Sequence, residues 1–144
     1  MADQYTRRAM QAVLGLNVRY AIIPAQTGVP AVGVVVTSGA GAWGAYKDLA
    51  AAKGITTEFW LCGLFFDTPG ATQIYEGQVA DATPTLLYPF RLEYLIVGAA
   101  GYSWHPHLPI SPPIYMPANA QVQARTGAAA AKVLGVSLLY ATAL

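Results

Sequence analysis

Hydrophobic and polar residues alternate in short segments of this chain, with the two-residue period of β-strands. In the segment 91–97, Leu92 and Tyr94 fall on one face and Arg91 and Glu93 fall on the other, because successive side chains of a strand point to opposite sides of the sheet. The pattern therefore predicts a half-buried strand here.

Strand-like segments recur along most of the chain, and Gly, Pro, Asn and Asp residues separate them, as is typical of β-rich folds. They span residues 14–24, 32–38, 45–50, 56–67, 72–79, 89–98, 120–126 and 132–141. This count predicts an all-β, single-domain, jelly-roll-like β-sandwich of about eight antiparallel strands. We expect the sandwich to occupy residues 14–144, after an N-terminal arm over residues 1–13 that is either extended or a short helix.

Two segments indicate how the sandwich is covered. The segment 120–125 places Gln121, Gln123 and Arg125 on one face, so we expect that face to be exposed to solvent. The segment 59–66, FWLCGLFF, is apolar on both faces. It predicts a central strand, or one whose second side is covered by a neighbouring subunit.

Local signals predict turns and short helices between these strands. The segments 67–70 and 117–119 have the composition of tight turns, and Asn119 tolerates the left-handed conformation that most residues avoid. The segments 3–14 and 49–53 contain good helix formers, and Gly54 would end the second helix.

The composition indicates that protein neighbours cover part of the surface. Hydrophobic residues make up 55% of the chain and charged residues only 10%, against about 25% charged residues in an average soluble domain. The apolar runs are short and interrupted, and no cleavage site follows the first of them, so we expect no membrane span and no export signal. Subunit contacts in an oligomer or a lattice then explain the apolar surface.

Charge and cysteine usage narrow the partners further. The eight basic residues are scattered along the chain and the net charge is +1, so nucleic-acid binding is not expected. Cys62 is the single cysteine and lies within an apolar run. It is expected to be a small core residue, and it requires no oxidising compartment.

The segment 102–117, YSWHPHLPISPPIYMP, is the most unusual in the chain. His105 and His107 would point the same way in an extended chain, as two zinc ligands require, but a third ligand is not evident within one chain. A site shared by symmetry copies stays open, and we expect no metal, cofactor or catalytic residue in the single chain. The prolines predict a stiff loop that forms sheet poorly.

Catalysis is not supported by the remaining polar residues, which include no nucleophile elbow and no evident pair of carboxylates. Carbohydrate binding stays open, because aromatic side chains can offer flat faces to sugars. The aromatic residues considered for it are Trp43, Trp60, Trp104, Tyr102 and Tyr115. Of these, Tyr102 and Trp104 have the best prospect of exposure because they fall in the proline-rich loop.

The N-terminal arm and the proline-rich loop are therefore the expected contact regions. Aromatic and arginine side chains are typical interface anchors. The candidate partner-contact residues are Tyr5, Arg7, Arg8, Tyr102, Trp104, His105, His107 and Tyr115.

Three stretches, 42–80, 112–126 and 132–141, resemble the small jelly-roll structural proteins of tailed bacteriophages. The shared features are a strand led by Trp, a hydrophobic strand, a Tyr-x-x-Gln-like strand end, and a Pro-aromatic-Pro-Ala corner before a polar strand that carries Arg. In this chain the matching residues are Trp43, Phe59, Tyr75, Pro113, Pro117 and Arg125. Asn119 stands where such corners usually have Gly, and the segment 103–112 has no counterpart.

The resemblance implies a non-enzymatic virion structural protein, commonly a homotrimer, made in the host cytoplasm. The expected function is that of a capsid decoration, or cement, protein, which binds the outer capsid surface and stabilises contacts between major capsid protein subunits. The alternative is a receptor- or carbohydrate-binding module of a head fibre or tail, with a glycan as partner.

Overall fold

The computed structural model describes residues 18–24, 33–67, 73–94, 96–97, 102–103 and 107–143, and these form β-strands joined by turns, without a helix. The strands are β1 (Val18–Ile23), β2 (Val34–Thr37), β3 (Gly39–Ala40), β4 (Lys47–Ala50), β5 (Phe59–Asp67), β6 (Gln73–Asp81), β7 (Leu86–Tyr94), β8 (Ile96–Val97), β9 (Tyr102–Ser103), β10 (His107–Met116), β11 (Val122–Ala128) and β12 (Val133–Ala143).

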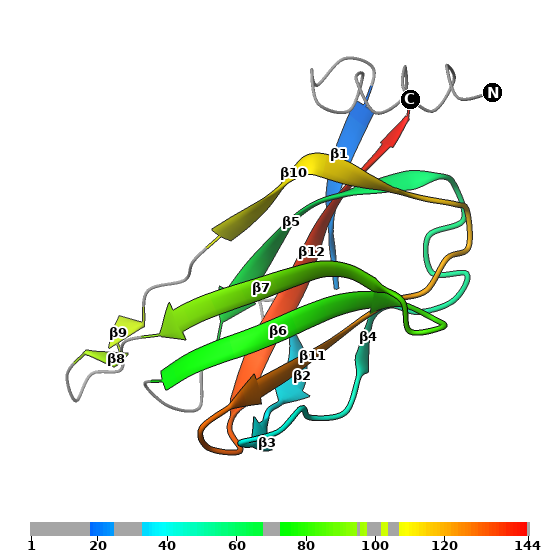
Figure 1. Cartoon of the computed structure of the whole chain (residues 1–144). Helices are drawn as coiled ribbons and strands as arrows, with labels where there is room; N and C mark the ends of the chain where they lie inside the picture. Colours follow the sequence, from blue (N-terminus) through cyan, green and yellow to red (C-terminus); the bar gives the residue numbers. More distant parts are fainter. Residues whose placement is uncertain are drawn as a thin grey trace.

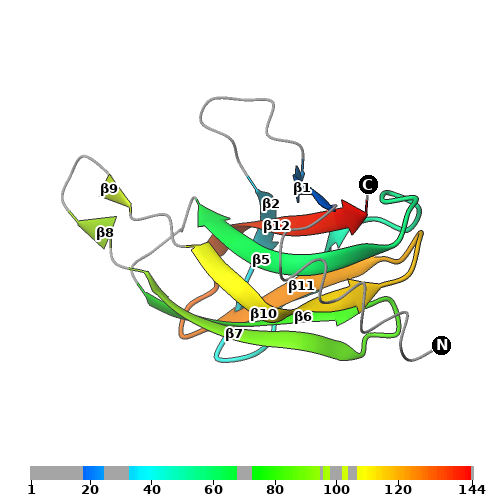
Figure 2. The same ribbon diagram turned by 90° about the horizontal axis from the view of Figure 1, so that it is seen from above.

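Two five-stranded sheets pack face to face as a β-sandwich (Figure 1 and Figure 2). The first has the order β1-β12-β5-β10. Its fifth strand, β2, pairs with β12 on the same side as β1. The second has the order β3-β11-β6-β7, and β4 pairs with β11. If β1 and β2 are counted as one interrupted strand and the two-residue β3 is left out, each sheet has four strands, and the total of eight is that of a jelly roll.

The predicted fold class is therefore confirmed. The pairings are antiparallel apart from the short parallel contact of β3 with β11, and the two-stranded sheet of β8 and β9 projects beyond one end of the sandwich (Figure 1).

The core lies between the sheets and is built by alternation along the strands, which in β5 is interrupted by a register shift between Leu61 and Gly63. In β5, Phe59, Leu61, Leu64 and Phe66 face inward and are at most 1% exposed. Phe66 meets Phe90 of β7, with ring centroids 5.1 Å apart, so aromatic side chains from the two sheets interlock at the centre. Burial on this scale is the main stabilising term of the fold.

The prediction for FWLCGLFF is confirmed, because β5 pairs with β12 on one side and with β10 on the other. The polar face of 120–125 is also confirmed. Val122 and Ala124 are fully buried, whereas Gln123 and Arg125 alternate with them and are partly exposed.

The predicted corner at 117–119 is confirmed as well. Asn119 has a φ of 66°, and the amide of Ala120 donates to the carbonyl of Pro117 at 3.3 Å. The left-handed backbone at this position is the reason for an asparagine.

Two expectations about local structure are wrong. The proline-rich segment does not stay out of the sheet, because His107–Met116 forms the ten-residue strand β10. This strand is an edge strand that pairs only with β5, and its register shifts between Pro109 and Ile114, across Pro112 and Pro113. An edge strand tolerates residues without amide donors because half of its amides have no ladder partner.

The predicted helical turn at 49–53 is the second error. Leu49 and Ala50 end β4 and are buried, and a turn follows in which Lys53 has a φ of 64°. Pairing with β11 and burial of Leu49 override the helix propensity of the alanines.

Several predictions lie outside the described residues. These are the N-terminal arm at 1–13, the helix at 3–14 and most of the turn at 67–70.

Candidate interaction surfaces

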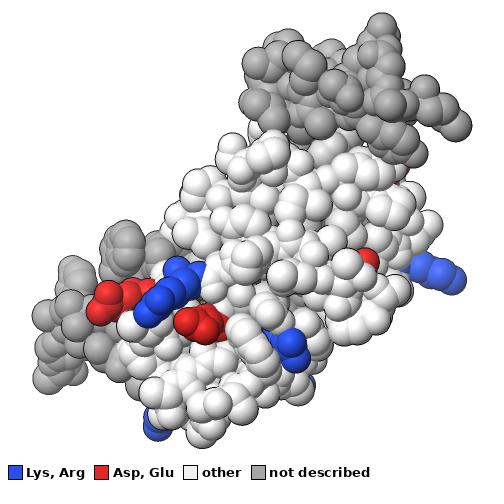
Figure 3. Space-filling view, viewed as in Figure 1, with Lys and Arg blue, Asp and Glu red and all other residues white. Residues whose placement is uncertain are grey.

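The outer faces of the two sheets differ sharply in charge. The strands of the β1-β12-β5-β10 sheet, with β2, contain only Arg19 and Asp67 as charged residues. The strands of the other sheet contain Lys47, Asp48, Glu76, Asp81, Arg91, Glu93 and Arg125. Figure 3 shows charged side chains gathered over the region of β6 and β7.

The outer side of the first sheet is termed the apolar face here. Its exposed members are Tyr20 at 50%, Val35 at 48% and Val133 at 38%. The alternation in each strand places them opposite the inward-facing core residues, and Val35 pairs with Gly135 and Tyr20 with Ala141 in the ladder. The other members, which are less exposed or carry a polar group, are Cys62, Phe65, His107, Tyr115 and Leu139.

Two of the predicted contact residues, His107 and Tyr115, lie on this apolar face. The His107 ring stacks on Phe65 with centroids 4.4 Å apart and 15° between the planes. It also covers Gly63, where an added Cβ would approach His107 Nε2 to 2.6 Å. Phe65 and Gly63 therefore hold the imidazole flat against the sheet.

Tyr115 lies toward the other end of β10. Its ring meets Trp60 edge-on at 5.9 Å, and its hydroxyl donates to Glu58 Oε1 at 3.0 Å. Trp60 itself is only 1% exposed, so it is not an available sugar platform.

Cys62 lies between these two aromatic clusters. Burial raises the pKa of the Cys62 thiol to about 11, against the opposing effect of a backbone hydrogen bond at Ala141. The thiol is thus neutral and unreactive at physiological pH. The expected place of Cys62 in the core is wrong, because the residue is only half-buried and is not part of the core cluster between the sheets.

The remaining predicted contact residues are not brought together by what the structure describes. Tyr5, Arg7, Arg8, Trp104 and His105 lie outside the described residues, and Tyr102 is described only as a backbone position in β9. The predicted arm and loop contacts thus remain predictions.

On the opposite sheet, the outer side of β11, β6 and β7 is termed the polar face here, and Trp43 is its most exposed aromatic residue, at 42%. The backbone around Trp43 is fixed along β11, because the amides of Gly41 and Gly44 donate to the carbonyls of Ala128 and Thr126, each at 2.8 Å. The ring rests on Gly127, where an added Cβ would be 3.3 Å from Trp43 Cε3. A glycine here lets the indole lie against the strand.

The Arg125 guanidinium lies over the face of the indole. Its guanidinium lies 5.0 Å from the Trp43 ring and 4.5 Å from the Tyr46 ring. Gln78 Oε1 accepts hydrogen bonds from Arg125 Nε and Nη2 at 2.9 and 2.8 Å. Arg125 is therefore engaged on the protein and positions Trp43 through a cation–π contact.

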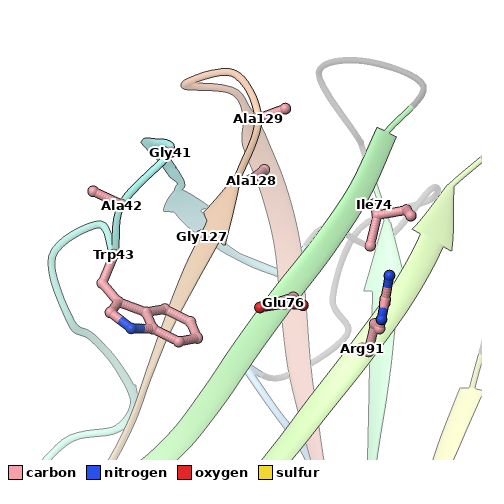
Figure 4. Close-up of a pocket in the computed structure, with 9 residues that line it drawn as sticks. All are labelled: Gly41, Ala42, Trp43, Ile74, Glu76, Arg91, Gly127, Ala128 and Ala129. Atoms are coloured by element: carbon pink, nitrogen blue, oxygen red, sulfur yellow. The ribbon is translucent and has the colours of Figure 1, made fainter.

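A hollow of about 610 Å³ opens beside the indole and is termed the Trp43 hollow here. Figure 4 shows Trp43 on one side, Ile74 and Arg91 on the other, and Glu76 between them. The rest of the lining is small: Gly41, Ala42, Gly127, Ala128 and Ala129. A second hollow of about 370 Å³ adjoins it and shares Trp43, Glu76 and Arg91.

Sequence reasoning missed the exposure of Trp43. The glycines of the segment GAGAWGAY could have indicated this exposure, because a large side chain on a tight glycine-rich turn has few neighbouring side chains to pack against. What exposes the ring is the bridge of Trp43 to Gly127, more than eighty positions along the chain.

Within the described ranges, no three His, Cys, Asp or Glu side chains gather as a metal site would require. The same part of the chain contains no helix with the length and apolar character needed to cross a membrane.

Comparison with known proteins adds little. No protein-family model and no curated protein matches the chain. Among solved structures, the chain is similar to one described as "Structure of infectious bursal disease virus Gx strain", with 13% identity and a TM-score of 0.33. The similarity covers 88% of this chain and 33% of that one. At this score it supports no inference about function.

Proposed function

We propose that this chain is a non-enzymatic virion structural protein of a tailed bacteriophage, a capsid decoration protein that binds the outer capsid surface and links major capsid protein subunits. The observation that carries the proposal is the apolar face, with Tyr20, Val35 and Val133 exposed on a sheet whose strands contain only two charged residues. Depletion of charge in a continuous surface is typical of protein interfaces.

The jelly-roll fold and the resemblance to small phage structural proteins support the choice of partner. Four residues of the resembling pattern have structural roles here: Phe59 and Tyr75 are fully buried, and Trp43 contacts Arg125. These roles explain the pattern as one that maintains the fold, and none of them is a catalytic role.

The mechanism is linkage between binding and assembly. A protein that binds the assembled lattice but not its separated subunits adds its binding free energy to the stability of the lattice. One site contributes about 2.7 kcal/mol when the free protein is at a hundred times its Kd. Repeated over many copies, this opposes the internal pressure of packaged DNA.

We further propose that the protein is a homotrimer, because closed symmetry buries apolar surface without leaving an open edge. Light scattering on a sizing column measures the absolute mass. A mass three times that of the 15.2 kDa chain is expected, and a monomer at all concentrations would contradict the trimer.

The test of the function is co-sedimentation with purified capsids of the encoding phage. We expect saturable binding at a fixed ratio to the major capsid protein, and decorated capsids that withstand higher temperature than bare ones. Failure to bind either expanded or unexpanded capsids would contradict the proposal.

A further inference from the structure

We propose that the Trp43 hollow is a saccharide-binding site, on the face of the sandwich opposite the one assigned to protein contacts. The inference goes beyond decoration, because it gives the exposed side of the protein a ligand of its own. It also moves the expected sugar site away from Tyr102 and Trp104.

The first requirement of such a site is a rigid aromatic surface. Trp43 meets it because the ring rests on Gly127, is flanked by Arg125 and is carried by backbone hydrogen bonds on both sides. The ring is still 42% exposed. A pyranose presents a face of C–H groups that can pack on an indole. Because the indole is already held in place, the protein loses little conformational entropy when the sugar binds.

The second requirement is a set of free polar groups within reach of the ring. Glu76 and Arg91 stand opposite each other in the ladder of β6 and β7, and both line the two adjoining hollows. Neither side chain is hydrogen bonded to another residue that the structure describes. The Glu76 carboxylate can accept from hydroxyl groups, and the Arg91 guanidinium can donate to them.

Charge balance favours an uncharged ligand. Glu76 and Arg91 contribute opposite charges to the hollow, and Arg125 is already engaged by Gln78. A neutral polyhydroxyl compound supplies hydrogen-bond donors and acceptors together. An anion would be repelled by the Glu76 carboxylate, and a cation would be repelled by the Arg91 guanidinium. The small floor of Gly127 and Ala128 leaves room for a ring above it.

The two hollows also indicate the length of the ligand. Because they share Trp43, Glu76 and Arg91, successive sugar units can occupy both, one of them stacked on the indole. A protein partner fits less well, since the hollow is shallow and has no deep apolar socket for an anchor side chain.

The test uses the three tryptophans, Trp43, Trp60 and Trp104, whose indole N–H groups give separate signals in a nitrogen-15 correlation spectrum. The Trp43 signal is assigned by its loss in Trp43→Phe. Neutral oligosaccharides of glucose, galactose, mannose and N-acetylglucosamine are added to the full chain at millimolar concentration. We expect at least one of them to shift the Trp43 signal saturably, while the signal of buried Trp60 stays in place.

Substitutions of the two polar residues distinguish a site that hydrogen-bonds the sugar from a ring on which any sugar stacks. Glu76→Gln and Arg91→Gln should each weaken the binding about tenfold. Tyr20→Ala, an exposed aromatic on the other face, should leave it unchanged. Binding that survives both polar substitutions would mean stacking on an exposed ring only, and would overturn the proposal.

Two other results would also overturn it. One is a Trp43 signal that none of the four sugar classes moves. The other is loss of capsid binding in Trp43→Ala without any saccharide response, which would make the hollow a protein contact. Because the spectra need no capsid, failure here is distinguishable from failure of the decoration proposal.

Discussion

The two outer faces of this sandwich are built from the same kind of strand, yet they present different chemistry. On the apolar face, the outward positions are filled by residues such as Tyr20, Val35 and Phe65. On the polar face, the corresponding positions are filled by Glu76, Gln78, Arg91, Gln123 and Arg125. A sheet needs only one apolar face to form a sandwich, so the second apolar face is not explained by the fold.

The comparison shows that the low charge of the chain is concentrated in one of the two sheets. In the described strands, charged residues are not spread evenly: one sheet contains only Arg19 and Asp67, and the other contains seven. A uniform distribution would favour a monomer with an unusually apolar surface, whereas this asymmetry favours one side that meets protein and one side that meets water.

The largest expected effect comes from separating the two sheets at their shared core. Phe66 is 1% exposed and packs on Phe90 of the other sheet, so Phe66→Ala should lower the free energy of unfolding by about 3–5 kcal/mol. Urea unfolding measures it. Val35→Ala, on the exposed apolar face, is the control and should change stability by less than about 0.5 kcal/mol. Equal losses in the two variants would contradict the assignment of core and outer face.

A smaller effect is expected from the hydrogen bond that connects the sheets. The hydroxyl of the fully buried Tyr75, on β6, donates to the carbonyl of Val133, on β12, at 3.1 Å. Tyr75→Phe should cost about 1 kcal/mol in unfolding free energy, because it removes the bond and keeps the ring. An unchanged unfolding midpoint would show that the bond contributes nothing.

The reactivity of Cys62 tests the apolar face. Its thiol pKa of about 11, against an ordinary value of 9.0, leaves roughly a hundredfold less thiolate at neutral pH. Alkylation by iodoacetamide should therefore be about that much slower in the folded protein than in urea. Similar rates in the two states would mean that this part of the face is open to water.

The pH dependence of stability tests the polar sheet and is the smallest effect. Asp81 Oδ1 accepts from the Thr83 hydroxyl and from the amides of Thr83 and Thr85, and these bonds lower the pKa of Asp81 below 3.8. A lowered folded-state pKa means that the contribution is present above 3.8 and is lost as the pH falls through the folded value.

Asp81→Asn should accordingly be slightly less stable than the natural chain at neutral pH, and the difference should shrink under more acidic conditions. Urea unfolding at a series of pH values measures it. A difference that grows as the pH falls would have the wrong sign for this account.

Much of the fold was predictable because two-residue alternation and turn residues are local signals. The strand β10 was not, since Pro112 and Pro113 are incompatible with a central strand but acceptable at an edge, and edge position is decided by tertiary pairing with β5. The site at Trp43 depends likewise on Gly127, Glu76 and Arg91. These come from three strands whose proximity no local pattern reveals.

The most direct measurement of the central claim compares two matched substitutions in capsid co-sedimentation. Val35 and Ile74 are similarly exposed, at 48% and 40%, but lie on opposite faces. Val35→Asp should weaken capsid binding at least about tenfold, because it buries a charge in an apolar contact, and Ile74→Asp should leave it unchanged. Full binding by Val35→Asp, or loss with Ile74→Asp alone, would contradict the assignment of the apolar face to the capsid.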